Sequence, residues 1–177
     1  MLLSVNLNES KPWMDWVDYI LSHVGGWRHF GGGKFHIGAL HDEAPAYTLT
    51  DDDLVQPNPD SPGPKVQINK RPYSDTYNRI ELVWTDRANN YAVAVAVAQD
   101  EVDQRVSGQI RKRTVKLDGI NNATLAAYQA QRLLIDSLYR YNIFKFIVGY
   151  KNMLLENGDV GTITDNFNLT AEKIRIM

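Results

Sequence analysis

The sequence predicts an α+β fold, mainly antiparallel β, in which a small barrel-like domain with one helix follows a helix plus β-hairpin subdomain. Three features predict it: an apolar helical face near the start, alternating apolar residues over 77–98, and an alanine-rich helical stripe after residue 123. The chain has 177 residues, 44% of them hydrophobic, which is enough for one domain or two small ones. We expect the helix/β-hairpin subdomain at residues 1–70 and the barrel domain at residues 71–177.

The first predicted element is a helix that begins near Ser10. Ser10 is a good N-cap, and Pro12 suits a first turn because its fixed φ matches that of a helix. Gly25-Gly26 ends the helix, since glycine tolerates the left-handed conformation beyond the last turn. The apolar face consists of residues at helical spacing: Trp13, Trp16, Val17, Ile20, Leu21 and Val24.

A β-hairpin is predicted directly after this helix. Residues 27–30 and 34–37 are the two short strands, and glycines 31–33 form the loop between them. No Lys-Ser or Lys-Thr follows these glycines, so they do not predict a phosphate loop. Beyond the hairpin we expect loop, with one extended piece at 47–50 and an exposed proline-rich connection at 56–64.

The second half of the chain predicts strands around one helix. The helix covers 124–141, is capped by Asn122 or Thr124, and has an alanine- and leucine-rich core stripe. Asn157-Gly158 predicts a tight turn. The predicted strands are 77–85, 91–98, 109–117, 142–148, 160–164 and 172–177. Antiparallel hairpins with a single helix indicate a small barrel that the helix plugs or flanks.

The composition excludes several classes of protein. The 19 basic and 21 acidic residues give a net charge of −2, so no basic excess attracts the chain to nucleic acid. The absence of cysteine excludes disulfides and thiolate metal sites, and fits synthesis in a reducing compartment. The start, Met1-Leu2-Leu3, has no basic lead of a signal peptide. No apolar stretch approaches the roughly 20 residues that a membrane helix needs, so we expect no membrane insertion.

The histidines are the first candidates for metal ligands. They are close in sequence: His23, His29, His36 and His41. A metal site would require them to converge with a carboxylate such as Asp42 or Glu43. Their spacings match no common ligand pattern, so we expect them to be scattered over a helix end, a hairpin and a loop.

The acidic run Asp51-Asp52-Asp53 is a second candidate, because carboxylates bind hard cations such as calcium. The run lacks the glycine and the glutamate that an EF-hand loop carries at its sixth and twelfth positions. We therefore expect a solvated turn. The sequence predicts no metal ligand and no cofactor-binding residue.

The remaining candidates are catalytic and sugar-binding residues. No serine lies in a nucleophile-elbow motif, and no pair of carboxylates is favoured over another, so we predict no catalytic residue and no enzyme. The tryptophans could line a sugar-binding groove. Core packing is the favoured interpretation, because three of them lie on apolar faces, and Trp27 beside the glycine-rich hairpin is the least defined. The four are Trp13, Trp16, Trp27 and Trp84.

The order of these elements resembles the hub domains of phage tail-tip proteins, among them the lambda-type host-specificity protein, the gene-transfer-agent hub and contractile-tail baseplate hubs. Type VI secretion spikes share these barrels. The resemblance covers residues 16–165. It is carried by the helix and hairpin at 20–27 and 33–37, the strands 78–84 and 91–100, the alanines 126, 127 and 130, and the turn 157–160. Asn157 stands where the family usually has proline.

The resemblance implies a mechanical role rather than a chemical one. Such hubs form homotrimers on the tail axis, dock on the tail tube and meet a spike or fibre below, which closes the tube. The expected location is the virion tail tip, after synthesis in the cytoplasm of a bacterial host. The expected partners are further copies of the chain and other tail-tube, spike or fibre proteins. Family members are usually much longer, so we expect a fragment, a cloned domain or a reduced relative.

A local run of basic residues raises the question of one further partner. It comprises Arg105, Arg111, Lys112, Arg113 and Lys116. The run could face a lumen through which DNA passes, or contact an acidic neighbour. We favour the solvated face of a strand.

Two alternatives to the hub remain from the sequence. A carbohydrate- or receptor-binding module of a tail tip predicts an exposed aromatic groove, whereas a cell-wall hydrolase predicts two carboxylates or a metal in a cleft.

Overall fold

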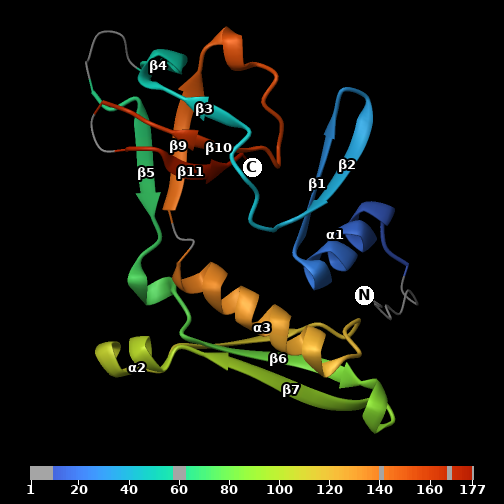
Figure 1. Ribbon diagram of the computed structural model, residues 1–177. Coiled ribbons are helices and arrows are strands. Elements are labelled where there is room, and N and C mark those ends of the chain that lie inside the picture. Colours follow the sequence, from blue (N-terminus) through green and yellow to red (C-terminus); the bar gives the residue numbers. More distant parts are fainter. Residues whose placement is uncertain (1–9, 58–62, 140–141, 167–168, 177) are drawn as a thin grey trace. The chain divides into compact units, whose positions relative to one another are not determined.

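The computed structural model describes residues 10–57, 63–139, 142–166 and 169–176 (Figure 1). The chain divides into two compact units, each built from two segments. Unit 1 comprises Met1–Gly26 and Arg71–Tyr141, and unit 2 comprises Trp27–Lys70 and Asn142–Met177. The two domains expected from the sequence, 1–70 and 71–177, stay a prediction.

Unit 1 contains a three-stranded sheet whose central strand is β6 (Arg79–Asp86). β7 (Ala92–Gln99) pairs with it antiparallel, and β8 (Lys112–Lys116) pairs with it parallel. A short helix, α2 (Glu101–Ser107), lies between β7 and β8 in the chain. Apolar residues at every second position of β6 give one buried face, as a period of two requires.

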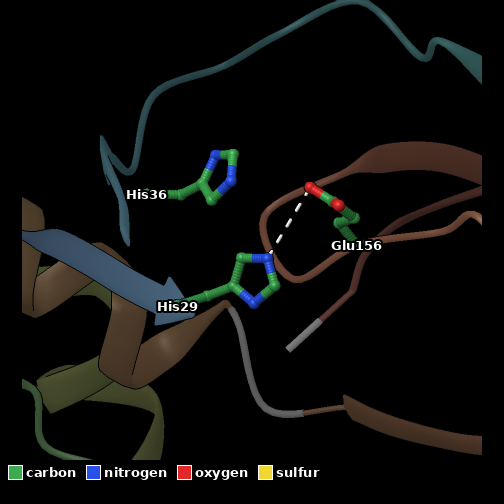
Figure 2. A group of neighbouring side chains, drawn as sticks. All are labelled: His29, His36 and Glu156. Atoms are coloured by element: carbon green, nitrogen blue, oxygen red, sulfur yellow. Dashed lines mark ion pairs between the residues drawn. The ribbon is translucent and has the colours of Figure 1, made fainter. Parts of the chain in front are cut away.

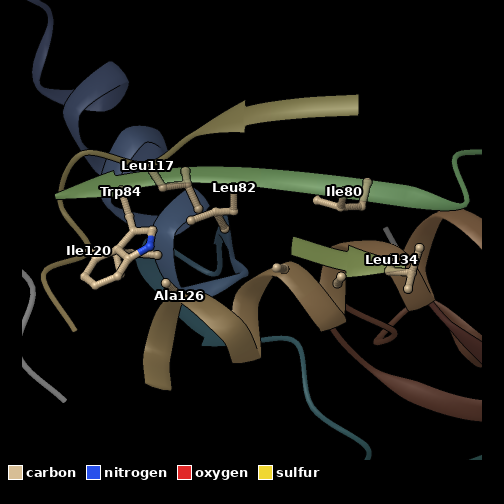
Figure 3. Packing of buried hydrophobic residues seen from close by; sticks show 9 residues of the cluster. Ile80, Leu82, Trp84, Leu117, Ile120, Ala126 and Leu134 are labelled. Atoms are coloured by element: carbon tan, nitrogen blue, oxygen red, sulfur yellow. The ribbon is translucent and has the colours of Figure 1, made fainter. Parts of the chain in front are cut away.

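Helix α3 (Ala123–Leu138) supplies the other side of this core (Figure 3). The Asn122 carboxamide oxygen accepts hydrogen bonds from the backbone N–H groups of Thr124 and Leu125, which caps the helix as expected. Small residues on α3 let it lie close to the sheet. The buried core consists of Ile80, Leu82, Trp84, Ala98, Leu117, Ile120, Ala126, Ala130 and Leu134.

Helix α1 (Trp13–Val24) also belongs to unit 1. It begins two residues later than expected: Pro12, not Ser10, holds the N-cap position, and its carbonyl accepts from the N–H of Asp15. Gly25 ends the helix with a φ of 66°, and the Arg132 guanidinium of α3 occupies the space that a Cβ there would need. Both observations explain why glycine stands at this position.

Unit 2 consists of small sheets. β1 (Gly26–Gly31) and β2 (Lys34–Ala39) form the predicted hairpin. The second sheet has the order β4 (Leu54–Val55), β9 (Asn142–Val148), β5 (Val66–Lys70), all antiparallel. The third has the order β11 (Glu172–Arg175), β10 (Val160–Ile163), β3 (Tyr47–Leu49), with β3 parallel to β10. The buried core residues are Leu49, Leu54, Val66, Ile163, Leu169 and Ile174.

Four short 3₁₀ turns complete the described elements. They are η1 (Asp51–Asp53), η2 (Tyr73–Asp75), η3 (Arg87–Asn89) and η4 (Tyr150–Asn152).

The structure confirms the α+β, mainly antiparallel class. In the described part of the chain the sheets are small and open, so the expected barrel is not closed. The predicted helix over 124–141 ends at Leu138, and residues 140–141 lie outside the described part. The same is true of residues 58–62 in the proline-rich stretch and of residue 177 in the last expected strand.

Candidate assembly surface and the predicted site residues

The outer face of the unit 1 sheet carries a stripe of valines on β7. Val93, Val95 and Val97 are 74%, 54% and 50% exposed. Alternation along the strand turns the intervening alanines toward α3, so the larger β-branched side chains point to solvent. β7 pairs with β6 alone among the described strands, and it therefore forms an edge of the sheet.

This valine stripe, Val93, Val95 and Val97, has the composition of a protein contact. An edge strand has unpaired backbone groups, and soluble monomers usually protect such an edge with charge or a covering element. Polar side chains flank the stripe, because Glu81 of β6 pairs with Arg79 and Lys112 at 3.1 Å each. An apolar centre beside an ion-paired margin is typical of interfaces between protein chains.

The basic run does not form an open positive patch. Arg105 pairs with Glu101 on α2, Lys112 with Glu81, and Lys116 with Asp118. The Arg113 guanidinium lies over the Tyr77 ring, 5.6 Å from its centroid. These partners neutralise or cover the charges locally. This favours the solvated face of a strand over a surface that faces DNA in a lumen.

Arg111 differs from the rest of the run because it is largely buried. Its Nη2 lies 2.7 Å from Oδ2 of Asp103, and its Nε donates to the Thr76 carbonyl at 2.9 Å. Asn78 donates to the same carboxylate at 2.8 Å, and the Tyr73 hydroxyl donates to its other oxygen. Burial alone would raise the pKa of Asp103, but the hydrogen bonds and the guanidinium outweigh burial and lower that pKa.

This Arg111–Asp103 network has a structural role. It joins α2 to the start of β8 and to the turn before β6, which are separate along the chain. The sequence did not indicate this network, because nothing in the basic run distinguishes Arg111 from its neighbours. The one available signal is Asp103, which lies eight positions before Arg111. Whether Asp103 meets Arg111 depends on where helix α2 ends.

Two of the four histidines have separate structural roles. His23 is fully buried at the end of α1; its Nδ1 lies 2.7 Å from the Tyr19 carbonyl, and its Nε2 accepts from the Gly119 N–H at 3.1 Å. These partners place the proton on Nδ1 of a neutral ring. His41 is exposed in a loop, where its Nε2 lies 2.9 Å from Glu43.

The other two histidines, His29 and His36, lie on the two strands of the hairpin with ring centroids 5.2 Å apart. Figure 2 shows both rings beside the carboxylate of Glu156, which comes from the turn before β10. The sequence placed these histidines on the hairpin correctly. It did not indicate Glu156, which is remote along the chain.

The acidic run forms the 3₁₀ turn η1. Thr50 and Asp53 make reciprocal hydrogen bonds across the turn, Asp51 pairs with Lys65 at 2.8 Å, and Asp53 pairs with Lys151 at 3.0 Å. The Thr50 N–H, followed by Lys151, lowers the pKa of Asp53 well below its usual range. Two of the three carboxylates therefore have lysine partners, and the side chains of Asp51 and Asp53 are only 20% and 9% exposed, so the turn is less solvated than expected.

The four tryptophans are divided between the two units, with Trp27 in unit 2 and the other three in unit 1. Trp84 is a core residue of unit 1 and Trp27 lies against glycines of unit 2. Trp13, expected in a core, is 64% exposed at the start of α1. The buried residues of this helix, Leu21 and His23, lie near its end. No described helix is long and apolar enough to cross a membrane.

The fold and the exposed valine stripe are those of a small α+β protein with an open sheet edge available for assembly. Residues 15–177 match the family described as "Putative phage tail protein", and the chain belongs to this family. The predicted relationship to phage tail-type proteins is therefore confirmed. No curated protein matches the sequence.

The solved structures that share the fold include two proteins of virions or tails. A chain from the virion of a native gene transfer agent particle has a TM-score of 0.72 at 14% identity, over 90% of this chain and 34% of that chain. The 43 kDa tail protein of prophage MuSo2 from Shewanella oneidensis has a TM-score of 0.61 at 14% identity, over 97% of this chain and 50% of that chain. The present chain therefore spans at most half the length of these two proteins.

Proposed function

We propose that this phage tail protein is a non-enzymatic structural part of the baseplate hub at the tail tip. It assembles with copies of itself into a ring, closes the tail tube, and connects the tube to a spike or fibre. The observation that carries the proposal is the valine stripe on β7, Val93, Val95 and Val97, at an open sheet edge.

The apolar stripe supports assembly because burying it in a contact is favourable. Removing apolar surface from water is worth roughly 25 cal/mol per Å², and an edge strand adds backbone hydrogen bonds when a second strand joins it. A cyclic ring requires heterologous contacts, in which the stripe meets a different surface of the next copy. Likeness of fold to a tail protein and to a virion chain is consistent with this role.

A first experiment measures the mass of the purified chain by light scattering over a range of concentrations. The expected result is a trimer whose population grows with concentration. Val95→Lys places a charge in the centre of the stripe, so this variant should be a monomer. Val55→Lys, on strand β4 of unit 2, is the matched control because Val55 is also an exposed valine, at 43%, and should leave the trimer intact.

A chain that stays monomeric at every concentration would contradict self-assembly through this stripe. Equal behaviour of the two lysine variants would assign assembly to another surface.

A second experiment tests the location. Gold-labelled antibody against the chain, applied to particles whose tails contain it, is expected to mark the end of the tail in electron micrographs. Label along the tube or on side fibres would contradict the hub assignment. Label on fibres, together with retention on a polysaccharide column, would support a receptor-binding module instead.

A further inference from the structure

His29, His36 and Glu156 lie together in unit 2, although Glu156 is far from the histidines in sequence. One donor atom from each side chain lies within 4.8 Å of the other two. Figure 2 shows both imidazoles grouped with the carboxylate, with the dashed line joining His29 and Glu156. From this arrangement we propose a binding site for a divalent transition-metal ion of the zinc class.

The hairpin geometry brings the two histidines face to face. Gly32 and Gly33 have φ values of 57° and 75°, as a two-residue type I′ turn requires. Such a turn pairs residue 31 with residue 34, and therefore sets position 29 opposite position 36. Directly opposed side chains on one face of a hairpin are close neighbours, and the 5.2 Å separation of the ring centroids agrees with this register.

Glu156 is fixed by a rigid turn of its own. The Glu156 N–H donates to the Asp159 carboxylate at 2.9 Å, and the Glu156 carbonyl accepts from the Asp159 N–H at 3.2 Å. Gly158 within this turn has a φ of 102° and anchors the turn by donating its N–H to the Ile176 carbonyl at 2.9 Å. The carboxylate therefore projects from a backbone that is already ordered.

The distance between His29 and Glu156 fits two ligands of one ion better than a direct hydrogen bond. Nε2 of His29 lies 3.6 Å from Oε2 of Glu156, which is too long for a hydrogen bond. Donors around a tetrahedral zinc ion are about 3.3 Å apart, from metal–donor distances of about 2.0–2.1 Å. The wider separations in the cluster close by rotation of side chains, and Glu156, at 49% exposure, has room to rotate.

A second observation indicates a missing partner at the same atom. Nε2 of His29 is buried and has no hydrogen-bond partner. A buried polar atom without a partner is costly, and such atoms are rare in folded proteins. A metal ion between His29, His36 and Glu156 would give this nitrogen its partner.

The donor types select the class of metal. Two imidazoles and one carboxylate suit zinc and the neighbouring first-row ions, whereas calcium and magnesium prefer oxygen donors alone. Three protein donors leave one position for water. The bound ion would tie the β1–β2 hairpin to the turn at residues 156–159, and so would stabilise unit 2.

The test uses the full chain, freed of any histidine tag and of metal, titrated with Zn²⁺ in a calorimeter and with Co²⁺ in a spectrophotometer. The expected result is one Zn²⁺ per chain and the visible absorption of four-coordinate Co²⁺. His36→Gln and Glu156→Gln remove one donor each and should weaken binding at least about 10-fold. Unchanged circular dichroism and unchanged melting of the metal-free variants establish that they fold.

Two further variants separate this site from general histidine binding. His41→Gln removes the exposed histidine paired with Glu43, and should leave the affinity unchanged. Gly31→Ala keeps all three donors, but its Cβ would lie 2.4 Å from Cε1 of His29, so the imidazole must turn away and binding should weaken. Gly63→Ala, whose Cβ meets nothing within 4 Å, is the control for that substitution.

Absence of saturable Zn²⁺ binding would overturn the proposal, and so would equal affinities for the wild-type chain, His36→Gln and Glu156→Gln. A loss of binding in His41→Gln as large as that in His36→Gln would place the ion elsewhere and would also overturn it.

Discussion

Arg111 and Asp103 form an ion pair in which the guanidinium Nη2 lies 2.7 Å from the carboxylate Oδ2. The side chains retain only 12% and 19% of their exposure. The Arg111 guanidinium also lies over the Tyr73 ring, with its carbon 4.1 Å from the ring centroid. The pair therefore has both electrostatic and packing contacts, which a solvated surface pair lacks.

Replacing Arg111 with methionine is expected to lower the free energy of unfolding by about 2–4 kcal/mol, since the Asp103 carboxylate stays largely buried without its cation. Urea unfolding followed by circular dichroism measures the loss. Arg105→Met is the control, because the Arg105–Glu101 pair is exposed and its loss should cost less than about 1 kcal/mol. Equal losses in the two variants would show that the Arg111 network does not stabilise unit 1 as argued.

Asp53 predicts a dependence of stability on pH. Its pKa is lowered in the folded chain by the Thr50 N–H and by Lys151. A group with a lowered pKa contributes its full stability above the pKa of the unfolded chain, about 3.9, and loses it as the pH falls further. Asp53→Asn should therefore lower the urea midpoint at pH 7, and the difference from wild type should shrink as the pH falls from about 4 toward about 2.

Asp52→Asn is the control for this experiment, because Asp52 is the exposed neighbour in the same turn. Its midpoint should follow that of the wild type at every pH. A difference between Asp53→Asn and wild type that stays constant from neutral to acid pH would contradict an electrostatic origin.

Removal of the His23 imidazole is expected to lower the stability of the chain strongly. Its ring accepts the Gly119 N–H at 3.1 Å in a fully buried position. His23→Ala would leave that N–H without a partner and open a cavity, at a cost of about 2–4 kcal/mol measured by thermal or chemical unfolding. His41→Ala, at an exposed position, should change stability by less than about 0.5 kcal/mol. A His23 variant as stable as wild type would mean that water or another group satisfies Gly119.

The sequence predicted the elements whose signals are local. The alternation around Leu82 and Val95 located β6 and β7, the capping residues Asn122 or Thr124 located the start of α3, and the three glycines 31–33 located the hairpin. Each signal depends on residues close together in the chain. The elements that were missed, α2, β4 and β5, are short, and β4 and β5 are strands only because each pairs with β9.

The candidate sites were predicted less well, because they depend on contacts between distant residues. The spacing of the histidines gave no reason to select His29 and His36, since the third member of the cluster is Glu156. The exposure of the valine stripe also required the structure. Alternating valine and alanine predicted the strand β7, but only the exposures of the valine side chains show that the valine face is open.

Trp27 and Gly158 provide the last prediction. A Cβ at position 158 would lie 2.2 Å from Cζ2 of Trp27, and Gly158 has a φ of 102°, which side-chain-bearing residues rarely adopt. Gly158→Ala therefore combines backbone strain with a steric clash, and is expected to destabilise the chain by about 2 kcal/mol or more. Thermal unfolding should show a lowered midpoint, with a change in tryptophan fluorescence as the Trp27 ring is displaced. Gly63→Ala, with open space around its Cβ and no positive φ, should leave both signals unchanged. If Gly158→Ala melts like Gly63→Ala, the contact between Trp27 and the turn at residues 156–159 does not hold the hairpin in place.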